Sequence, residues 1–258
     1  MIVDKALREA RSVLRFDSDA PSLDAERLVL HAMGRREPSW LAAHGDEQLP
    51  DAAAAHLASL VRRRQTGEPL AYILNEWEFY GRRFFIDEQV LVPRPDTEML
   101  VERALEYVLR QARPLIIADI GTGSGCVVIT LALELATVIS LPAFIATDIS
   151  PATLSVAKRN AKKFRVLDKI EFIQSNMLDF LKGRKTMVDL IVSNPPYVTS
   201  QELAQAGQTP DTIGLTFEPK VALDGGSDGQ NFIRQIAVSG IPAFVEVTGG
   251  RVQEFNVA

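Results

Sequence analysis

The chain has 258 residues, of which 47% are hydrophobic and 24% are charged, and its net charge at pH 7 is −5. This length accommodates one large and one smaller domain, and this composition is typical of folded globular proteins. The acidic balance argues against an extended nucleic-acid surface, which would need clustered lysine and arginine to neutralise phosphates. The single cysteine, Cys126, excludes an intramolecular disulfide and fits a reducing compartment.

The N-terminal sequence has the features of neither a secretory signal nor a transit peptide. Residues 1–22 mix acidic and basic side chains and contain no long apolar run. Elsewhere the sequence has no stretch of roughly 20 uncharged apolar residues, the length that a membrane-spanning helix needs. We therefore expect a cytoplasmic protein that does not bind membranes.

Residues 1–75 are expected to form a small helical domain. Apolar residues recur at helical spacing over residues 6–14, 22–33 and 51–64, which predicts three helices. Residues 62–64 are three consecutive arginines at the end of the third helix, where positive charge complements the helix dipole. We interpret them as a solvated helix end in preference to a partner-binding surface.

The composition changes after residue 75. Residues 77–94 are rich in aromatic and β-branched residues around a turn at Gly81, which predicts a β-hairpin. We expect residues 76–92 to link the helical domain to the rest of the chain. Residues 94–111 then predict an amphipathic helix, with Pro95 in its first turn.

Strands and helices alternate in the expected third domain, residues 93–258. Apolar runs predict strands at 115–121, 143–149, 170–176, 187–193 and 242–248, and helices at 125–138 and 151–163 follow the first two. Continuous apolar strands separated by helices are typical of a parallel sheet that is covered on both faces. The predicted fold class is therefore α/β, with a doubly wound, Rossmann-like sheet.

The ends of the first two predicted strands indicate a ligand site. The first strand leads into Gly121-Thr122-Gly123-Ser124-Gly125, whose glycines let the backbone approach a ligand before a helix N-terminus that favours anions. The spacing is G-x-G-x-G and not the dinucleotide pattern G-x-G-x-x-G. Asp148 ends the second strand, where an acid commonly binds ribose hydroxyls. Together these residues predict a nucleoside ligand with an anionic or zwitterionic tail; a tight turn without a ligand is the alternative.

The fourth predicted strand ends in Asn194-Pro195-Pro196-Tyr197, which we call the NPPY corner. The side-chain carbonyl oxygen of Asn194 and the backbone carbonyl oxygen of Pro195 can each accept one hydrogen of a planar amide or amine. Tyr197 offers a ring to stack on that group, and the prolines keep the backbone rigid. The alternative interpretation is a stiff turn that only ends the strand.

The order of these motifs resembles S-adenosylmethionine-dependent methyltransferases that act on planar nitrogens. GEPLAYILNEWEFYG (67–81), VLVPRPDTEMLVE (90–102) and FEPKVALDGGSDGQNF (217–232) further resemble the HemK/PrmC family of protein-(glutamine-N5) methyltransferases. This resemblance implies a class I methyltransferase domain that methylates the glutamine of the Gly-Gly-Gln motif in peptide-chain release factors. S-adenosylmethionine would leave as S-adenosylhomocysteine, and we expect a monomer that needs neither a metal nor direct contact with nucleic acid.

The resemblance also implies roles for individual residues. The cofactor would be bound by Gly121, Thr122, Gly123, Gly125, Asp148, Asn176, Met177 and Asn194. The substrate amide would be held by Asn194, Pro195, Pro196 and Tyr197, of which Asn194 and Pro195 are the expected catalytic residues. The helical domain and the hairpin would help to dock the release factor.

The chain departs from the family pattern at three places. Asn176 stands where an acid is usual, and Asn75 stands where a glycine is usual. The family's last two strands are expected to be missing, which would leave the sheet truncated at an exposed edge. Arg94 and Glu98 lie near the expected cofactor site, and the sequence leaves open whether they act there or form a structural ion pair.

Three other functions are compatible with parts of the sequence. A methyltransferase for exocyclic amines of nucleic acids would use the same NPPY corner, but it would want a basic groove. A nicotinamide-dependent dehydrogenase would want the other glycine spacing and has no use for the NPPY corner. An inactive, truncated remnant would bind the cofactor without turnover.

Overall fold

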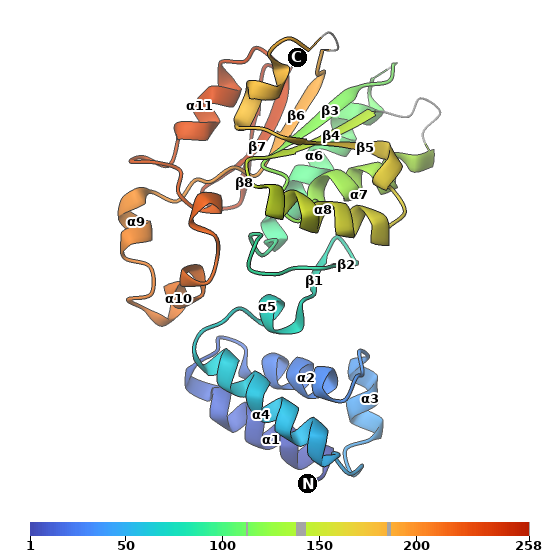
Figure 1. Cartoon of the computed structure of the whole chain (residues 1–258), viewed down its shortest axis with the longest axis vertical. Coiled ribbons are helices and arrows are strands. Elements are labelled where there is room, and N and C mark those ends of the chain that lie inside the picture. Colours follow the sequence, from blue (N-terminus) through green and yellow to red (C-terminus); the bar gives the residue numbers. More distant parts are fainter. Residues whose placement is uncertain (112, 138–142, 185–186, 258) are drawn as a thin grey trace. The chain divides into compact units, whose positions relative to one another are not determined.

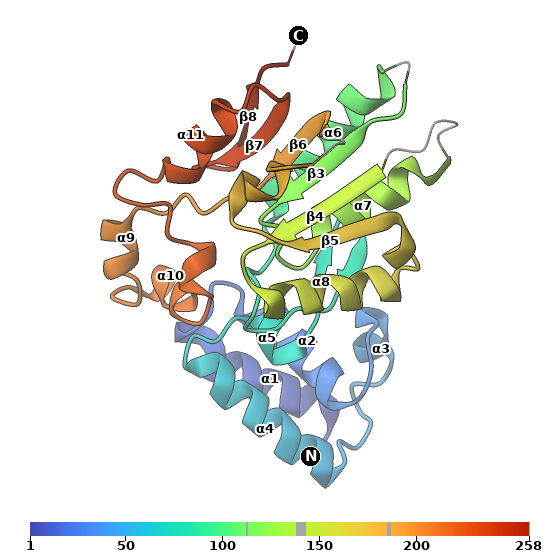
Figure 2. The same cartoon turned by 45° about the horizontal axis from the view of Figure 1, so that its top comes forward.

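The computed structural model describes residues 1–111, 113–137, 143–184 and 187–257 (Figures 1 and 2). The chain divides into two compact units. The first contains residues 1–75 and 206–217, and the second contains residues 76–205 and 218–258. The predicted helix end at Val138 and the chain's last residue, Ala258, lie outside the described residues.

The first unit is helical. Its elements are α1 (Val3–Val13), the 3₁₀ helix η1 (Leu14–Phe16), α2 (Pro21–Ala32), α3 (Pro38–Ala43), α4 (Asp51–Gln65), α5 (Leu70–Leu74), α10 (Pro210–Ile213) and η6 (Gly214–Thr216). Helices α1, α2 and α4 pack against one another and bury apolar side chains such as Leu14, Leu28 and Leu60. The three helices that the sequence predicts are therefore present, and the short α3 and α5 are additional.

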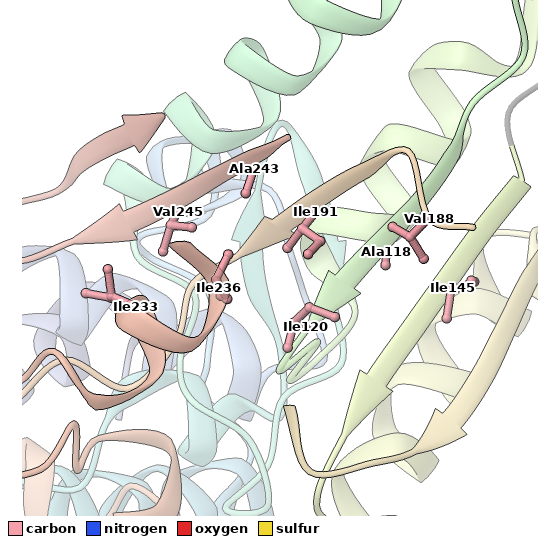
Figure 3. Packing of buried hydrophobic residues seen from close by; sticks show 9 residues of the cluster. All are labelled: Ala118, Ile120, Ile145, Val188, Ile191, Ile233, Ile236, Ala243 and Val245. Atoms are coloured by element: carbon pink, nitrogen blue, oxygen red, sulfur yellow. The ribbon is translucent and has the colours of Figure 1, made fainter. Parts of the chain in front are cut away.

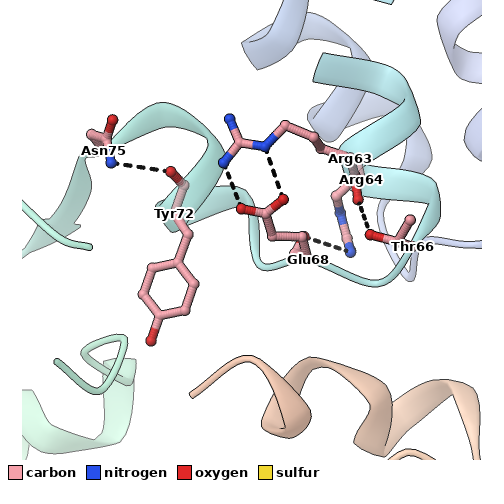
Figure 4. A network of polar contacts seen from close by, with 6 residues as sticks. All are labelled: Arg63, Arg64, Thr66, Glu68, Tyr72 and Asn75. Atoms are coloured by element: carbon pink, nitrogen blue, oxygen red, sulfur yellow. Dashed lines mark hydrogen bonds and ion pairs between the residues drawn. The ribbon is translucent and has the colours of Figure 1, made fainter. Parts of the chain in front are cut away.

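Buried charge ties α4 to α2 inside this unit. Asp24 is only 6% exposed, and its Oδ2 accepts hydrogen bonds from Arg64 Nε at 2.6 Å and from Ser18 Oγ at 2.7 Å. Arg63 forms a bidentate ion pair with Glu68, in which Nε donates to Oε2 at 2.9 Å and Nη2 donates to Oε1 at 2.5 Å (Figure 4). The interpretation of the arginine triplet as a solvated helix end is wrong for Arg64, because a buried carboxylate needs a charged partner.

Asn75 follows α5 in the left-handed conformation, with φ 52° and ψ 29°. Its side-chain Nδ2 donates to the Tyr72 carbonyl oxygen at 3.2 Å (Figure 4). Asparagine is one of the few residues other than glycine that adopts this conformation at a helix end. The backbone geometry therefore explains why a glycine would also suit this position.

We predict that Asn75→Ala lowers the free energy of unfolding by about 1 kcal/mol, the cost of a left-handed β-carbon-bearing residue. Asn75→Gly, the matched control, should keep the stability of the original chain, since glycine adopts a positive φ without strain. Urea denaturation of the three proteins measures the difference. Equal losses in both variants would show that the side-chain hydrogen bond matters and the backbone angle does not.

The second unit begins with the predicted hairpin. Strands β1 (Trp77–Phe79) and β2 (Arg82–Phe84) are antiparallel, and Tyr80 and Gly81 between them have φ of 52° and 67°. The hairpin is shorter than the predicted 77–94. Phe85, the next residue, donates its N–H to Asn160 Oδ1 at 2.7 Å, and its carbonyl oxygen accepts from Asn160 Nδ2 at 2.9 Å. Those backbone groups are therefore not available to extend the ladder.

Six strands of the described residues form the main sheet: β3 (Ile116–Ile120), β4 (Ala143–Asp148), β5 (Ile170–Gln174), β6 (Leu190–Ser193), β7 (Ala243–Val247) and β8 (Arg251–Phe255). Their order is β5-β4-β3-β6-β7-β8, and all neighbours are parallel except β7 and β8. The chain order reverses between β3 and β6, which is where doubly wound sheets bind ligands. The predicted α/β class and Rossmann-like sheet are confirmed.

The edge of the sheet corrects one expectation. Strand β8, which the sequence analysis missed, pairs with β7 along its whole length, from Ala243 with Phe255 to Val247 with Arg251. The sheet therefore does not stop at the fifth strand. The turn between β7 and β8 contains Gly249 and Gly250, both at positive φ. Exposed polar side chains along β8 discourage pairing of this edge with another chain.

Helices cover both faces of the sheet. The elements α6 (Glu98–Leu109), α7 (Cys126–Glu134) and α8 (Pro151–Lys163) lie side by side on one face, and α11 (Asn231–Ala237) and η5 (Met177–Leu181) pack together on the other. On the α11 face, Ile233 and Ile236 belong to one buried apolar cluster with strand residues such as Ala118, Ile120 and Val245 (Figure 3).

The remaining elements of the second unit are short: η2 (Pro95–Thr97), η3 (Leu135–Thr137), η4 (Leu167–Lys169), α9 (Ser200–Ala204) and η7 (Lys220–Ala222). Among the described residues, no helix combines the length and the apolar character that a bilayer crossing requires. The packed sheet thus fixes where each strand ends, and the residues that the sequence marks for a ligand site lie at those ends or just after them.

Candidate active site

The carboxyl ends of β3, β4, β5 and β6 surround one cavity of about 160 Å³ in the second unit. Each strand contributes residues directly after its last ladder position. The segments 89–93 and 219–222 complete the wall, together with Thr97 and Phe232. The cavity thus lies where the strand order predicts a ligand.

The glycine bend after β3 forms one side of the cavity. Gly121 and Gly123 line it with φ of 71° and 57°, a conformation that side chains with a β-carbon rarely adopt. Gly125 does not line the cavity. It is the N-cap of α7, and a β-carbon there would come within 2.9 Å of Ile129 Cδ1 and 3.2 Å of Ala157 Cβ. Gly125 therefore permits close packing of α7 and α8, while Gly121 and Gly123 shape the cavity surface.

Asp119, the last residue but one of β3, lines the cavity although it is only 2% exposed. Its Oδ2 accepts a hydrogen bond from Thr122 Oγ1 at 2.7 Å. Burial raises the pKa of the Asp119 carboxyl to about 7, and the hydrogen bonds from Thr122 and from the Val128 backbone act against that rise. Near neutral pH the Asp119 carboxyl is therefore present in both its neutral and its ionised form, and a ligand beside it can meet either one.

Asp148 links the ends of β4 and β3. Its Oδ2 accepts from the Gly123 N–H at 3.2 Å, and its Oδ1 accepts from the Ser150 N–H at 3.0 Å. Burial raises the pKa of the Asp148 carboxyl, and these backbone hydrogen bonds oppose the rise. A carboxylate oxygen has more than one acceptor site, so Asp148 keeps capacity for hydroxyl groups in the cavity.

Asn176 and Met177 follow β5 and line the cavity from a third side. Met177 has φ 47°, a rare backbone conformation for a residue with a long side chain. The Met177 side chain packs against the apolar cluster under α11. Asn176 is exposed, so its carboxamide is free to rotate towards a ligand.

The NPPY corner follows β6 on the opposite side of β3. Asn194 lines the cavity, and its Nδ2 donates to Thr97 Oγ1 at 3.1 Å. Its Oδ1 is buried and has no hydrogen-bond partner among the residues that the structure describes. Pro196 lines the cavity, whereas Pro195 and Tyr197 do not. The Tyr197 hydroxyl instead donates to Glu246 Oε1 at 3.2 Å, and burial together with this carboxylate raises the pKa of Tyr197 to about 12.

A glycine loop supports the backbone of the NPPY corner from outside the cavity. A β-carbon on Gly225 would come within 2.7 Å of the Pro196 carbonyl oxygen, and one on Gly229 would come within 2.3 Å of the Tyr197 carbonyl oxygen. Val198 N–H donates to the Leu223 carbonyl, and Gly225 N–H donates back to Val198. Backbone packed this closely has little room to move, so the loop fixes the corner.

Arg94 and Glu98 do not pair with each other. Arg94 pairs with Glu218 at 2.5 Å, and the buried Glu218 carboxylate also accepts from the Val92 N–H at 3.1 Å. Glu98 accepts from the Tyr80 N–H at 2.7 Å. Glu218 therefore joins the segments 89–93 and 219–222, which form the outer wall of the cavity.

Eight of the residues that the sequence marks for the site line this one cavity: Gly121, Thr122, Gly123, Asp148, Asn176, Met177, Asn194 and Pro196. Sequence reasoning missed Thr97, Asp119 and Glu246. Asp119 opens the glycine motif and Glu246 is a lone acid inside an apolar strand, and a buried charge of that kind is an informative signal. Thr97 carried no signal of its own, because a threonine at a helix start is ordinary.

The raised pKa of Asp119 predicts how stability depends on pH. The folded protein holds this proton up to about pH 7, whereas an unfolded aspartate releases it near pH ~3.9. The contribution of Asp119 is thus fully present in acid and is lost as the pH rises to 7. Asp119→Asn removes this dependence. Between pH 4 and pH 8, the free energy of unfolding of the variant should therefore rise relative to that of the original protein, by at most about 4 kcal/mol.

Denaturant titrations of the cofactor-free proteins across this range test the expectation. Asp189→Asn is a control of opposite sign, because hydrogen bonding to Arg113 lowers the pKa of Asp189. That variant should lose stability relative to the original protein at neutral pH, and the difference should fade in acid. Parallel pH profiles for the original protein and Asp119→Asn would contradict the assignment.

Known proteins resemble the chain in both units. Residues 5–74 match the family model described as the PrmC N-terminal domain, and residues 99–209 match one described as an RMKL-like methyltransferase domain. The chain is 37% identical to the release factor glutamine methyltransferase of Cereibacter sphaeroides, over 93% of this chain and 80% of that protein. The enzymes of the same name from Neisseria gonorrhoeae and Moorella thermoacetica are each 38% identical, over 85% and 91% of this chain and 75% and 78% of theirs. The resemblance to the HemK/PrmC sequences is confirmed, and the chain belongs to the family of release factor glutamine methyltransferases.

Proposed function

We propose that this enzyme transfers a methyl group from S-adenosylmethionine to the side-chain amide nitrogen of the glutamine in the Gly-Gly-Gln motif of peptide-chain release factors. The observation that supports this most directly is the Asn194 Oδ1 atom. It is a buried acceptor at the cavity wall with no partner among the described residues. Such an atom is costly unless a ligand hydrogen occupies it. An amide N–H₂ group supplies that hydrogen.

The cavity has the features that S-adenosylmethionine needs. A β-carbon on Gly121 would meet no described atom within 4 Å, so the glycine bend leaves open space for the methionine part of the cofactor. Asp148 would accept from the ribose hydroxyls, and Asn176 and Met177 would contact the adenine. The adenine amino group is a donor, which the Asn176 carbonyl oxygen accepts without an acid at that position. When bound, the cofactor supplies an electrophilic methyl group.

The protein's own part in the reaction is to position the amide. Asn194 Oδ1 and the Pro195 carbonyl oxygen would each accept one hydrogen of the substrate N–H₂ group, so that the nitrogen lone pair faces the glycine bend. The amide nitrogen would form the new N–C bond as the methyl–sulfur bond of the cofactor breaks, which gives S-adenosylhomocysteine, and the nitrogen would release a proton to solvent. Holding reactants in this orientation supplies much of the rate enhancement in positioning catalysis. Tyr197 would stabilise the corner from outside the cavity, because its hydroxyl donates a hydrogen bond to Glu246.

The wider assignments follow from the same proposal. The helical residues 1–75 and the hairpin linker, residues 76–92, would dock the release factor, and residues 93–258 would carry the chemistry. The enzyme would act as a cytoplasmic monomer, without a metal and without direct contact with nucleic acid. The net charge of −5 supports the last point, because nucleic-acid surfaces are basic.

Mass spectrometry of a release factor incubated with the enzyme and S-adenosylmethionine tests the proposal. One methyl group should appear on the glutamine of the Gly-Gly-Gln motif, and a release factor with alanine at that position should stay unmodified. Asn194→Ala should lower the rate by on the order of 100-fold or more, since it removes the amide acceptor.

Ribosomal RNA and DNA offered in the same assay separate the rival functions. Methylation of an exocyclic amine in either one, with an unmodified release factor, would overturn the proposal in favour of a nucleic-acid enzyme. Cofactor binding without turnover on any substrate would indicate an inactive remnant. Tighter binding of NADH than of S-adenosylmethionine would favour a dehydrogenase.

The glycine loop generates a second prediction. Gly225→Ala should push the backbone of the NPPY corner out of place and lower kcat/KM for the release factor by about tenfold or more. Affinity for S-adenosylmethionine should be retained, because Gly225 does not line the cavity. Gly214→Ala is the matched control, since a β-carbon there would meet only the Gly67 carbonyl oxygen at 3.9 Å. Unchanged turnover by Gly225→Ala would refute the role of the loop.

A further inference from the structure

Four polar side chains at the NPPY corner are in contact: Asn194 and Thr97, which line the cavity, and Tyr197 and Glu246, which do not. Asn194 Nδ2 donates to Thr97 Oγ1 at 3.1 Å, and Tyr197 Oη donates to Glu246 Oε1 at 3.2 Å. The Thr97 hydroxyl also interacts with the Glu246 carboxylate. Thr97 is 2% exposed and Glu246 is 1% exposed, so water does not compete for these groups. The first and last residues of the corner are thus connected to one buried carboxylate.

The chemistry of these groups sets the direction of the hydrogen bonds. An ionised carboxylate only accepts, and a threonine hydroxyl has a single proton. Tyr197 donates to Glu246 Oε1, whereas the buried Glu246 Oε2 accepts no direct hydrogen bond among the described residues, so Oε2 is the acceptor towards which the Thr97 proton is directed. With its proton directed at Glu246, Thr97 can only accept from Asn194. Asn194 must then place its N–H₂ group towards Thr97 and its Oδ1 on the other side.

We propose that Thr97 and Glu246 are positioning residues that fix the orientation of the Asn194 carboxamide, so that the acceptor and not the donor is presented to the substrate amide. This inference rests on the proposed function. The two orientations of an asparagine carboxamide have nearly the same shape, so packing alone selects poorly between them. A flipped Asn194 would present N–H₂ to the N–H₂ of the substrate, and no hydrogen bond would form.

Neither residue touches the reacting atoms in this assignment. Glu246 lies outside the cavity, and Thr97 reaches its wall but is bound to Asn194. Glu246 also fixes the other end of the corner through Tyr197. One carboxylate therefore sets both the direction of the Asn194 acceptor and the position of the Tyr197 ring. The expected effect of both residues is on turnover of the release factor, and a change at Glu246 should leave cofactor affinity unaltered.

Three variants test the proposal. Thr97→Val keeps the shape and removes the hydroxyl, and it should lower kcat by about 10- to 100-fold. Thr97→Ser keeps the hydroxyl and should restore most of that loss, which a purely space-filling role would not. Glu246→Gln offers an N–H₂ group to Thr97 Oγ1, so that Thr97 donates to Asn194 and the carboxamide flips; it should lose activity to a similar degree. For Glu246→Gln, whose side chain lies outside the cavity, S-adenosylmethionine affinity, measured by calorimetry, should change less than about twofold.

The kcat of the double variant, Thr97→Val with Glu246→Gln, tests whether the two residues act through the same group. Because both changes act through Asn194, the double variant should be no slower than the slower single variant. Multiplicative losses would mean that the two residues act independently, which would overturn the proposal. Full activity of Thr97→Val would overturn it as well.

A spectroscopic measurement separates this inference from the proposed function. The side-chain amide signals of Asn194 in the ¹⁵N-labelled protein, assigned by their loss in Asn194→Ala, report its hydrogen bond without any turnover. An upfield proton shift in Thr97→Val, and its reversal in Thr97→Ser, is expected whatever the substrate is. Unshifted signals refute the hydrogen-bond network. A shifted signal with an unmodified release factor refutes only the proposed function.

Discussion

The parallel pairing of β3 with β6 is the constraint on which the site depends. The register places Asp119 beside Val192, so the two strands end together, and Ser193 Oγ donates to the Ile120 carbonyl oxygen at 2.7 Å. Two turns of opposite character therefore start side by side. The turn after β3 is all glycine and small polar residues, and it leaves space. The turn after β6 is proline-rich and fills space with a fixed polar edge.

Rigidity at this edge comes from several layers of structure. Proline rings restrict the backbone of the corner, the loop around Gly225 packs against it at backbone distance, and buried polar side chains fix its ends. The buried carboxyls near the cavity have a cost, since Glu246 behind the corner and Asp119 in β3 are held out of water, and burial raises the pKa of both. Strain and buried charge of this kind cluster where a protein sacrifices stability for function.

Much of the fold was predictable because it follows from local patterns. The apolar runs predicted β3 to β7 within two or three residues, and the glycine motif and the NPPY corner follow β3 and β6, whose ends line the cavity. Strand β8 was missed because Arg251, Gln253 and Glu254 are polar and only their pairing with β7 makes them a strand. Thr97 was missed because its role depends on contacts with residues about 100 and 150 positions away, Asn194 and Glu246, and no local pattern encodes such distances.

The helical unit is discontinuous in the sequence. Residues 206–217 belong to it, although they are inserted between the NPPY corner and Glu218, and the chain passes between the units at 75–76, 205–206 and 217–218. Ile213 occupies the space that a side chain at Gly67 would need, so the inserted segment completes the packing at the end of α4. The two units are consequently not interchangeable modules. A replacement of residues 1–75 alone would therefore separate residues 206–217 from the helices they pack with, so an exchange of the helical unit must include both segments.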